Sequence, residues 1–355
     1  MSAIHAGKSH LRRWLFCLAI ASGLLLCACS EQPIPVELSG RSMGTTWHVT
    51  YLPAPAAKGD PPGYIQKEIE SILDKVNLSM STYRSDSEIS RFNVLVVDEW
   101  LAISAGFVTV LDAALTVGEA SGGAYDVTVG PLVNLWGFGP QAREDSVPDK
   151  GELEVLLQHV GQGKLRLDRQ GRKLLKTDEL SLDFSSVAKG YAVDLVANWL
   201  GSRGVNDYLV EVGGEMRLSG KKSGGELWRV AIESPDSLHG SVATAISLSD
   251  SAVATSGDYR NYFEVDGKRF SHTIDPRTGY PVEHDLVSVT VVHSRAMMAD
   301  AWATALTVLG ADRAMEVALT EGLAVYFIRR EGDSYISSYS PPFENYLESA
   351  NGQLH

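Results

Sequence analysis

Hydrophobic and polar positions follow two different periods along this chain of 355 residues. Between residues 64 and 80, apolar side chains recur every three to four positions, as they do on one face of an amphipathic helix. In other segments, such as residues 46–51 (TWHVTY), apolar and polar residues alternate as in a half-buried strand. Because both periods recur along the chain, we expect a fold that contains helices and strands.

The predicted fold class is α+β, with helices flanking a largely antiparallel set of strands. Ser104 is a predicted N-cap, and Gly122-Gly123 follows the end of the same helix. Helices are predicted within residues 64–80, 104–121, 151–161, 189–204, 297–310 and 312–322. Strands are predicted within residues 46–51, 164–176 (a hairpin), 180–184, 208–214, 215–220, 228–233, 244–249, 252–257, 262–265, 268–273, 286–292, 324–330 and 334–339.

The first 28 residues resemble a bacterial export signal. Three basic residues precede an uncharged apolar run, residues 14–28, which is shorter than the roughly 20 residues that a membrane-spanning helix needs. The run leads into the sequence LCACS, which resembles the lipobox at which lipoproteins are cleaved and lipidated. We expect lipidation at Cys29, with Cys27 as the alternative site and an uncleaved membrane anchor as the alternative role.

This interpretation divides the chain into a signal peptide (1–28), a membrane tether (29–42), a folded domain (43–345) and a C-terminal tail (346–355). It places the protein on the periplasmic side of the cell envelope, anchored by lipid in the inner or the outer membrane. All three cysteines lie within the first 29 residues, so disulfides cannot stabilise the domain. The segment after the signal carries a net charge of −16, which argues against nucleic-acid binding.

Two segments carry residues suited to binding a phosphate and a cation. Ser185, Ser186 and Lys189 lie where a predicted helix begins, and helix N-termini bind phosphate; the alternative is an N-capped helix with a surface lysine. Asp300 and Thr304 lie one turn apart on another predicted helix. Their oxygens suit Mg2+ or Ca2+, with further ligands from Ser186 or from phosphates. The alternative is a helix-end aspartate and a threonine that bonds back to a carbonyl.

A candidate catalytic base precedes a predicted turn. In RFSHTIDPRTGYPV, residues 269–282, Asp275-Pro276 and Thr278-Gly279 have the composition of a turn. His272 lies beside this turn, and an imidazole can accept a proton from a hydroxyl nucleophile. Asp275 is expected either to orient His272 or to stabilise the turn.

Several stretches, taken together and in order, resemble the ApbE family, the FAD:protein FMN transferases. They include MGT, STY, AYDVTVGPLVNLWGFG, DFSSVAKGYAVD, VGGE, TSGDY, HTIDPRTG and ADAWATAL, and they extend from about Gly40 to about Leu309. The resemblance implies an ApbE-like or T-fold-like arrangement and a Mg2+-dependent enzyme that binds FAD. Such an enzyme attaches the FMN moiety of FAD to a Thr or Ser hydroxyl through a phosphoester bond and releases AMP.

The resemblance also implies roles for individual residues. His272 matches the histidine that acts at the reacting hydroxyl. The metal ligands would be the side chains of Asp300 and Thr304 and backbone oxygens of Ser186 and Ala303. The residues that match FAD contacts of the family are Met43, Ser81, Thr82, Tyr83, Ala124, Tyr125, Asp126, Asp183, Lys189 and Ile274.

Two other functions fit the same residues. One is a metal-dependent FAD pyrophosphatase that yields FMN and AMP, and the other is a flavin-binding lipoprotein without catalysis. For a transferase, the resemblance implies target proteins with a short acceptor motif similar to Asp-Gly-x-Thr. Redox subunits of sodium-pumping NADH:quinone reductases and of Rnf-type complexes are the expected targets.

Overall fold

The computed structural model describes residues 33–54, 59–141, 143, 146–235, 242–257 and 262–347. The predicted signal peptide, Cys29 and most of the predicted C-terminal tail lie outside these residues. In the described part of the chain, no helix has the length and apolar character needed to cross a membrane. The fold below is that of the compact unit that begins at Pro35.

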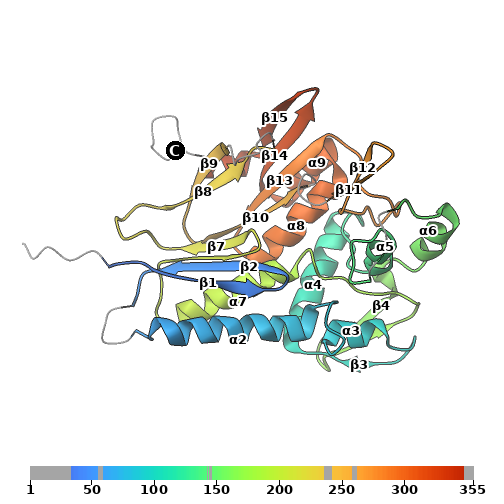
Figure 1. Cartoon of the computed structure of the whole chain (residues 1–355), viewed down its shortest axis with the longest axis horizontal. Coiled ribbons are helices and arrows are strands. Elements are labelled where there is room, and N and C mark those ends of the chain that lie inside the picture. Colours follow the sequence, from blue (N-terminus) through green and yellow to red (C-terminus); the bar gives the residue numbers. More distant parts are fainter. Residues whose placement is uncertain are drawn as a thin grey trace, which may run out of the picture. The chain divides into compact units, whose positions relative to one another are not determined.

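An eight-stranded antiparallel sheet forms the framework of this unit (Figure 1). Its strands lie in the order β1-β2-β6-β7-β10-β13-β14-β15. The bounds are β1 (Val36–Ser42), β2 (Thr45–Tyr51), β6 (Tyr208–Val212), β7 (Glu215–Ser219), β10 (Ser251–Gly257), β13 (Leu286–His293), β14 (Ala324–Glu331) and β15 (Ser334–Tyr339).

The sheet is buried on both faces, as strand β14 illustrates. Val325 and Phe327 belong to a large core between the sheet and the helices, whereas Tyr326 and Ile328 belong to a second core on the opposite face. Two elements close the second core. One is the two-stranded sheet of β8 (Trp228–Glu233) and β9 (Val242–Leu248), and the other is the 3-10 helix η2 (Pro341–Tyr346). Two buried faces explain why the central strands have nearly continuous apolar sequences.

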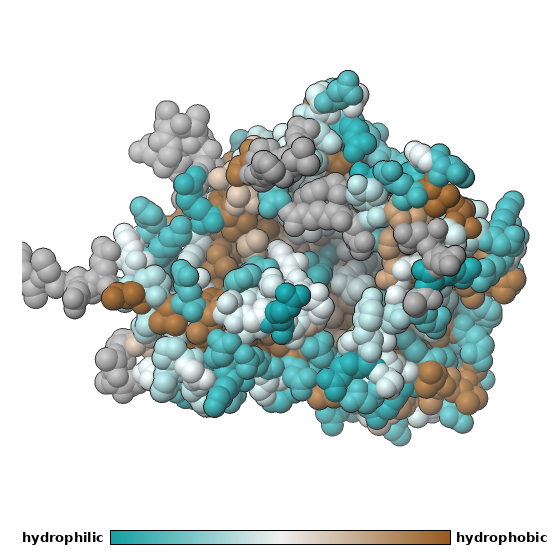
Figure 2. Space-filling model, in the orientation of Figure 1, coloured by the Kyte–Doolittle hydropathy of each residue, from teal (hydrophilic) through white to brown (hydrophobic). Residues whose placement is uncertain are grey.

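Helices α2, α7, α8 and α9 contact one face of the sheet. Helix α7 contacts β6 and β7, and α8 contacts β10 and β13, while α2 packs against α7 and α4 against α8 (Figure 1). Polar residues predominate along the outer face of α2 (Figure 2). The helices are α2 (Pro62–Met80), α3 (Glu88–Asn93), α4 (Ala105–Ala120), α5 (Gly130–Leu135), α6 (Lys150–Leu157), α7 (Ala188–Ser202), α8 (Ala296–Leu309) and α9 (Ala311–Glu321).

A third, smaller core joins the chain segments next to the pocket described below. It packs α5 and α6 against the ribbon of β11 (Tyr262–Val265) and β12 (Lys268–Ser271). Trp136 is its centre, with its ring 5.4 Å from that of Phe270. A remaining three-stranded sheet consists of β3 (Leu101–Ala102), β4 (Leu165–Asp168) and β5 (Lys173–Lys176), and the 3-10 helix η1 (Gln162–Lys164) precedes it.

All six predicted helices are present, and Ser104 caps α4 by accepting a hydrogen bond from Phe107 N. Three differences have physical reasons. Residues 36–42, predicted as part of the tether, form β1 and pair with β2, because pairing satisfies their backbone groups within the sheet. Residues 180–184 are not a strand, because only Ser181 makes a bridge, to Val129. Helices α3 and α5 have only six residues each, too few to show a period.

Helices α7 and α8 approach each other closely at Gly190. A Cβ atom added there would lie 2.4 Å from the carbonyl oxygen of Ala296, which is shorter than a van der Waals contact. Only glycine permits this backbone contact.

We predict that Gly190→Ala lowers the melting temperature, because relieving the overlap costs about 1–3 kcal/mol. Gly201→Ala is the matched control, since it lies on the same helix with no atom within 4 Å of the added Cβ. The control should be neutral, or more stable by about 0.5–1 kcal/mol, through helix propensity. Scanning calorimetry of the two variants measures this, and equal melting temperatures would contradict the close contact.

Candidate active site

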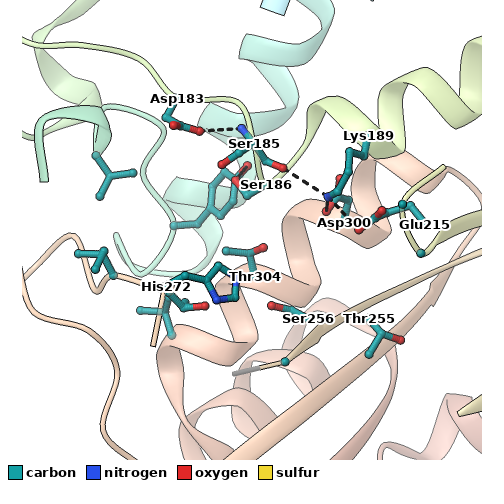
Figure 3. Close-up of a pocket in the computed structure, with 18 of the residues that line it drawn as sticks. Asp183, Ser185, Ser186, Lys189, Glu215, Thr255, Ser256, His272, Asp300 and Thr304 are labelled. Atoms are coloured by element: carbon teal, nitrogen blue, oxygen red, sulfur yellow. Dashed lines mark hydrogen bonds and ion pairs between the residues drawn. The ribbon is translucent and has the colours of Figure 1, made fainter. Parts of the chain in front are cut away.

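A pocket of about 520 Å³ lies beside α7 and α8, a volume suited to a small-molecule ligand. Segments far apart in the sequence contribute to it: the residues before α5, the start of α7, the β6–β7 turn, β8, the end of β10, the segment after β12, and α8 (Figure 3). Eleven of the residues proposed from the sequence line this one pocket: Ala124, Tyr125, Asp126, Asp183, Ser185, Ser186, Lys189, His272, Ile274, Asp300 and Thr304.

The other proposed residues do not line this pocket. Met43 lies in the β1–β2 turn with a positive φ of 52°, followed by Gly44 at 74°. Ser81, Thr82 and Tyr83 follow the end of α2, and 73% of Tyr83 is exposed. The two segments are tied together by a hydrogen bond of 3.0 Å from Asn77 Nδ2 to Ser42 Oγ.

A cluster of one half-buried lysine and two buried carboxylates forms one wall of the pocket. Lys189 Nζ lies 3.0 Å from Glu215 Oε1 and 3.8 Å from Asp300 Oδ1 (Figure 3). The second oxygen of Asp300 accepts a hydrogen bond of 3.0 Å from Gly190 N. The cluster therefore joins α7, α8 and the beginning of β7.

Sequence reasoning missed Glu215. Glu215 lies in the stretch VGGE and at the start of the strand predicted over residues 215–220, but neither pattern assigns a role to its carboxylate. Gly213 and Gly214 both have positive φ, and their turn leads directly into Glu215 at the pocket wall. The sequence does carry a signal for Glu215: it is a charged residue that directly follows two glycines at the start of a predicted strand.

The cluster has unusual protonation energetics. Burial raises the pKa of Glu215 to about 8, although Lys189 opposes the shift, and burial likewise raises the pKa of Asp300. Burial alone would lower the pKa of Lys189, but the charges of Asp300 and Glu215 outweigh it and raise that pKa. Two buried acids that share one ammonium retain protons more readily than isolated acids in water.

The donors of this wall fit a hard divalent cation. Oε2 of Glu215 is buried without a hydrogen-bond partner among the described residues, and when both acids are ionised the cluster has one more carboxylate than it has cations. Unpaired oxygen and excess negative charge are what Mg2+ satisfies. In the described part of the chain, no group of three or more His, Cys, Asp or Glu residues is arranged to hold a metal. Further ligands would therefore have to be hydroxyl, backbone or phosphate oxygens.

Thr304 and Ala303 differ in how their oxygens are used. Within the described residues, the Thr304 hydroxyl makes no back-bond to its helix. Thr307 does make one, of 2.8 Å to the carbonyl oxygen of Ala303, so that oxygen already has a hydroxyl donor. Thr304 lines the pocket and Ala303 does not.

The start of α7 is held by local hydrogen bonds. Asp183 Oδ1 accepts from Ser185 N at 2.7 Å, and Ser186 Oγ donates to Tyr125 Oη at 2.9 Å. No side chain caps α7. The N–H groups of Ala188 and Gly190 are nevertheless used, by Phe184 O and by Asp300. These two amides are therefore not free to bind an anion, and Lys189 is the cationic group at this end of α7.

His272 lies on the opposite wall, near Thr304 (Figure 3). Its ring is edge-on to Phe138, with 6.3 Å between the ring centres. Both carboxylate oxygens of Asp275 accept hydrogen bonds from the Arg277 guanidinium, at 2.9 and 2.7 Å, which favours the turn role for Asp275. Trp136 Nε1 donates to Gly279 O at 2.8 Å, so the stretches AYDVTVGPLVNLWGFG and HTIDPRTG contact each other directly.

The chain is similar to known proteins over most of its length. Residues 43–327 match the ApbE family. A relative from Vibrio cholerae named FAD:protein FMN transferase is 45% identical over 338 residues, which cover 95% of this chain and 99% of the relative. A relative of the same name from Haemophilus influenzae is 43% identical over 337 residues, covering 94% and 97%.

Solved structures show the same fold. The flavin transferase ApbE from Vibrio cholerae superposes with a TM-score of 0.83 at 44% identity, covering 89% of this chain and all of the other. The apo form of the Pseudomonas stutzeri flavinyl transferase ApbE also has a TM-score of 0.83, at 39% identity, covering 90% and 99%. The chain therefore belongs to the ApbE family.

Proposed function

We propose that this protein transfers the FMN moiety of FAD to a Thr or Ser hydroxyl of a target protein. The hydroxyl oxygen attacks the phosphorus of the FMN half, a phosphoester bond forms, and the bond to the AMP phosphate breaks, so that AMP leaves. The observation that carries the proposal is that His272 and the Lys189, Asp300 and Glu215 cluster line one pocket. The names of the relatives support the same reaction.

Different residues of the pocket accept the proton and supply positive charge. His272 accepts the proton of the attacking hydroxyl, because a neutral hydroxyl is a poor nucleophile at neutral pH. Lys189 provides positive charge for the phosphates in an otherwise acidic protein. Phosphoryl transfer depends mainly on positioning and on such charge stabilisation.

A divalent cation, for which Mg2+ is our proposal, would be held by Asp300, Thr304 and a backbone oxygen of Ser186. It would neutralise charge on the phosphate oxygens. Glu215 is close enough to Lys189 to tune the charge of this wall. Because metal binding favours ionised ligands, it should release protons from the two acids.

The proposed setting is the periplasmic side of the cell envelope, with the enzyme anchored through Cys29. The proposed partners are redox subunits of sodium-pumping NADH:quinone reductases or Rnf-type complexes that carry a threonine acceptor motif. The support is the export signal and lipobox-like sequence, together with the family resemblance.

We predict that His272→Ala slows covalent flavin transfer by about 10²–10⁴-fold while FAD affinity changes little, because only the proton acceptor is lost. Mass spectrometry and in-gel fluorescence of a target domain incubated with FAD and Mg2+ measure transfer. His159→Ala is the control, since His159 pairs with Asp178 and does not line the pocket. Free FMN and AMP with unmodified target would indicate a pyrophosphatase, and binding without either product a flavin carrier.

Removal of the metal should stop the reaction. We expect EDTA to abolish transfer and added Mg2+ to restore it. Asp300→Asn should raise the Mg2+ concentration needed for half-maximal rate, because an amide is a weaker ligand for a hard cation. Transfer that continues after thorough chelation would exclude the metal from the mechanism.

The raised pKa of Glu215 should make the free energy of unfolding of the metal-free protein depend on pH. With a pKa raised from 4.5 to about 8, the folded state keeps a proton that the unfolded chain has lost. The free energy of unfolding should therefore fall as the pH rises from about 5 to 8. Its slope should be at most about 1.4 kcal/mol per pH unit, which corresponds to one proton. Urea titrations should show a flatter profile for Glu215→Gln, and parallel profiles would refute the raised pKa.

A further inference from the structure

Helix α8, which carries Asp300 and Thr304, begins without a cap of its own. Arg295 occupies its N-cap position and makes no side-chain capping hydrogen bond. The first turn of a helix has N–H groups without intrahelical partners, and leaving them unsatisfied in a buried position is costly. Ala296 and Met297 are both buried, so their amides need acceptors from elsewhere in the protein.

Asp194 of α7 supplies these acceptors from a distant part of the chain. Its Oδ1 accepts a hydrogen bond of 3.0 Å from Ala296 N, and its Oδ2 accepts one of 3.1 Å from Met297 N. Arg217 Nη1, on β7, donates to the same carboxylate at 3.0 Å. Asp194 is only 6% exposed, and its charge is balanced by Arg217 and by the positive end of α8.

One turn away, a second contact joins the same two helices, with the roles of donor and acceptor exchanged. Gly190 precedes Asp194 by one turn on α7, and Asp300 follows Ala296 by about one turn on α8. Here the donor is Gly190 N on α7 and the acceptor is the Asp300 carboxylate on α8, at 3.0 Å. Two aspartates, one on each helix, thus bind backbone amides of the opposite helix and set the alignment of α7 with α8.

The same three elements carry the charged cluster of the pocket. Lys189 precedes Gly190 on α7, Glu215 lies two residues before Arg217 on β7, and Asp300 lies on α8. A shift of α8 by one residue would turn its side chains by about 100° and would move Asp300 away from Lys189. The hydrogen bonds of Asp194 oppose that shift.

We propose that Asp194, with Arg217, is a positioning residue of the active site. It aligns α7, β7 and α8 so that the Asp300 carboxylate is held by Gly190 N and faces Lys189. This inference rests on the proposed function only in assigning these groups to flavin transfer, because the alignment itself can be measured in the resting protein.

The test compares Asp194→Asn with Asp149→Asn. Both aspartates accept hydrogen bonds from two backbone amides at a helix start, but Asp149 caps α6 and does not line the pocket. An asparagine retains one acceptor oxygen and presents an NH2 group to donors, so each variant loses part of a cap. Both variants should have lower melting temperatures than the wild type.

Hydrogen exchange and the metal requirement separate positioning from stability. In Asp194→Asn, the amide of Gly190 should exchange faster, relative to the core strands, because its bond to Asp300 is loosened. The Mg2+ concentration for half-maximal transfer should rise by about 10–100-fold with little change in kcat at saturating Mg2+. Asp149→Asn should change neither quantity. Unchanged Gly190 exchange in Asp194→Asn would overturn the proposal.

A second variant tests the proposal even if Asp194→Asn does not fold. Arg217→Gln removes the guanidinium cation but leaves both amide donors to Asp194. It should therefore raise the Gly190 exchange rate and the Mg2+ requirement by less than Asp194→Asn does. A lack of effect on both the exchange of Gly190 and the Mg2+ requirement would also contradict the proposal. If the wild type transfers no flavin, the proposed function fails, and the exchange measurement still decides the role of Asp194.

Discussion

The close contact of α7 with α8 is the constraint on which the rest of the pocket depends. At Gly190 the two backbones meet without an intervening side chain, and the Gly190 amide can therefore reach the Asp300 carboxylate. The contact orients Asp300 and places Lys189, the preceding residue of α7, beside it. A wider separation of the helices would remove both interactions at once.

This arrangement concentrates charge where a polar group is costly to bury. Lys189, Asp300 and Glu215 each gain an opposite charge nearby, yet the cluster keeps one excess carboxylate and one unpaired oxygen. A protein interior tolerates such a deficit at functional sites, where a ligand supplies the missing charge. For an acidic protein that is to bind a dinucleotide, Lys189 offsets part of the repulsion at this wall, and the proposed cation would offset more.

The opposite wall is built by packing of aromatic side chains. Trp136 lies between α5 and the ribbon of β11 and β12, and its indole binds the turn at Gly279. His272 directly follows β12, so its position depends on that small core. The pocket thus has one wall aligned by hydrogen bonds between helices and another aligned by hydrophobic contacts.

The sequence alone determined the elements with a clear period and the motifs with a recognisable order. The six long helices, most strands and the pair of Asp300 and Thr304 follow from local spacing, because a helix places residues i and i+4 on one face whatever surrounds it. Short helices such as α3 left no periodic signal, because they have fewer than two turns. That residues 36–42 join the sheet depends on their pairing with β2, which local sequence does not show.

Only the tertiary structure decided which of the chemically suited residues meet. Glu215 and Asp194 are ordinary strand and helix residues by pattern, and their roles arise from contacts with partners 26 and 102 residues away or more. Local sequence sets the face on which a side chain lies, but burial, charge and hydrogen bonding across elements set what it can do.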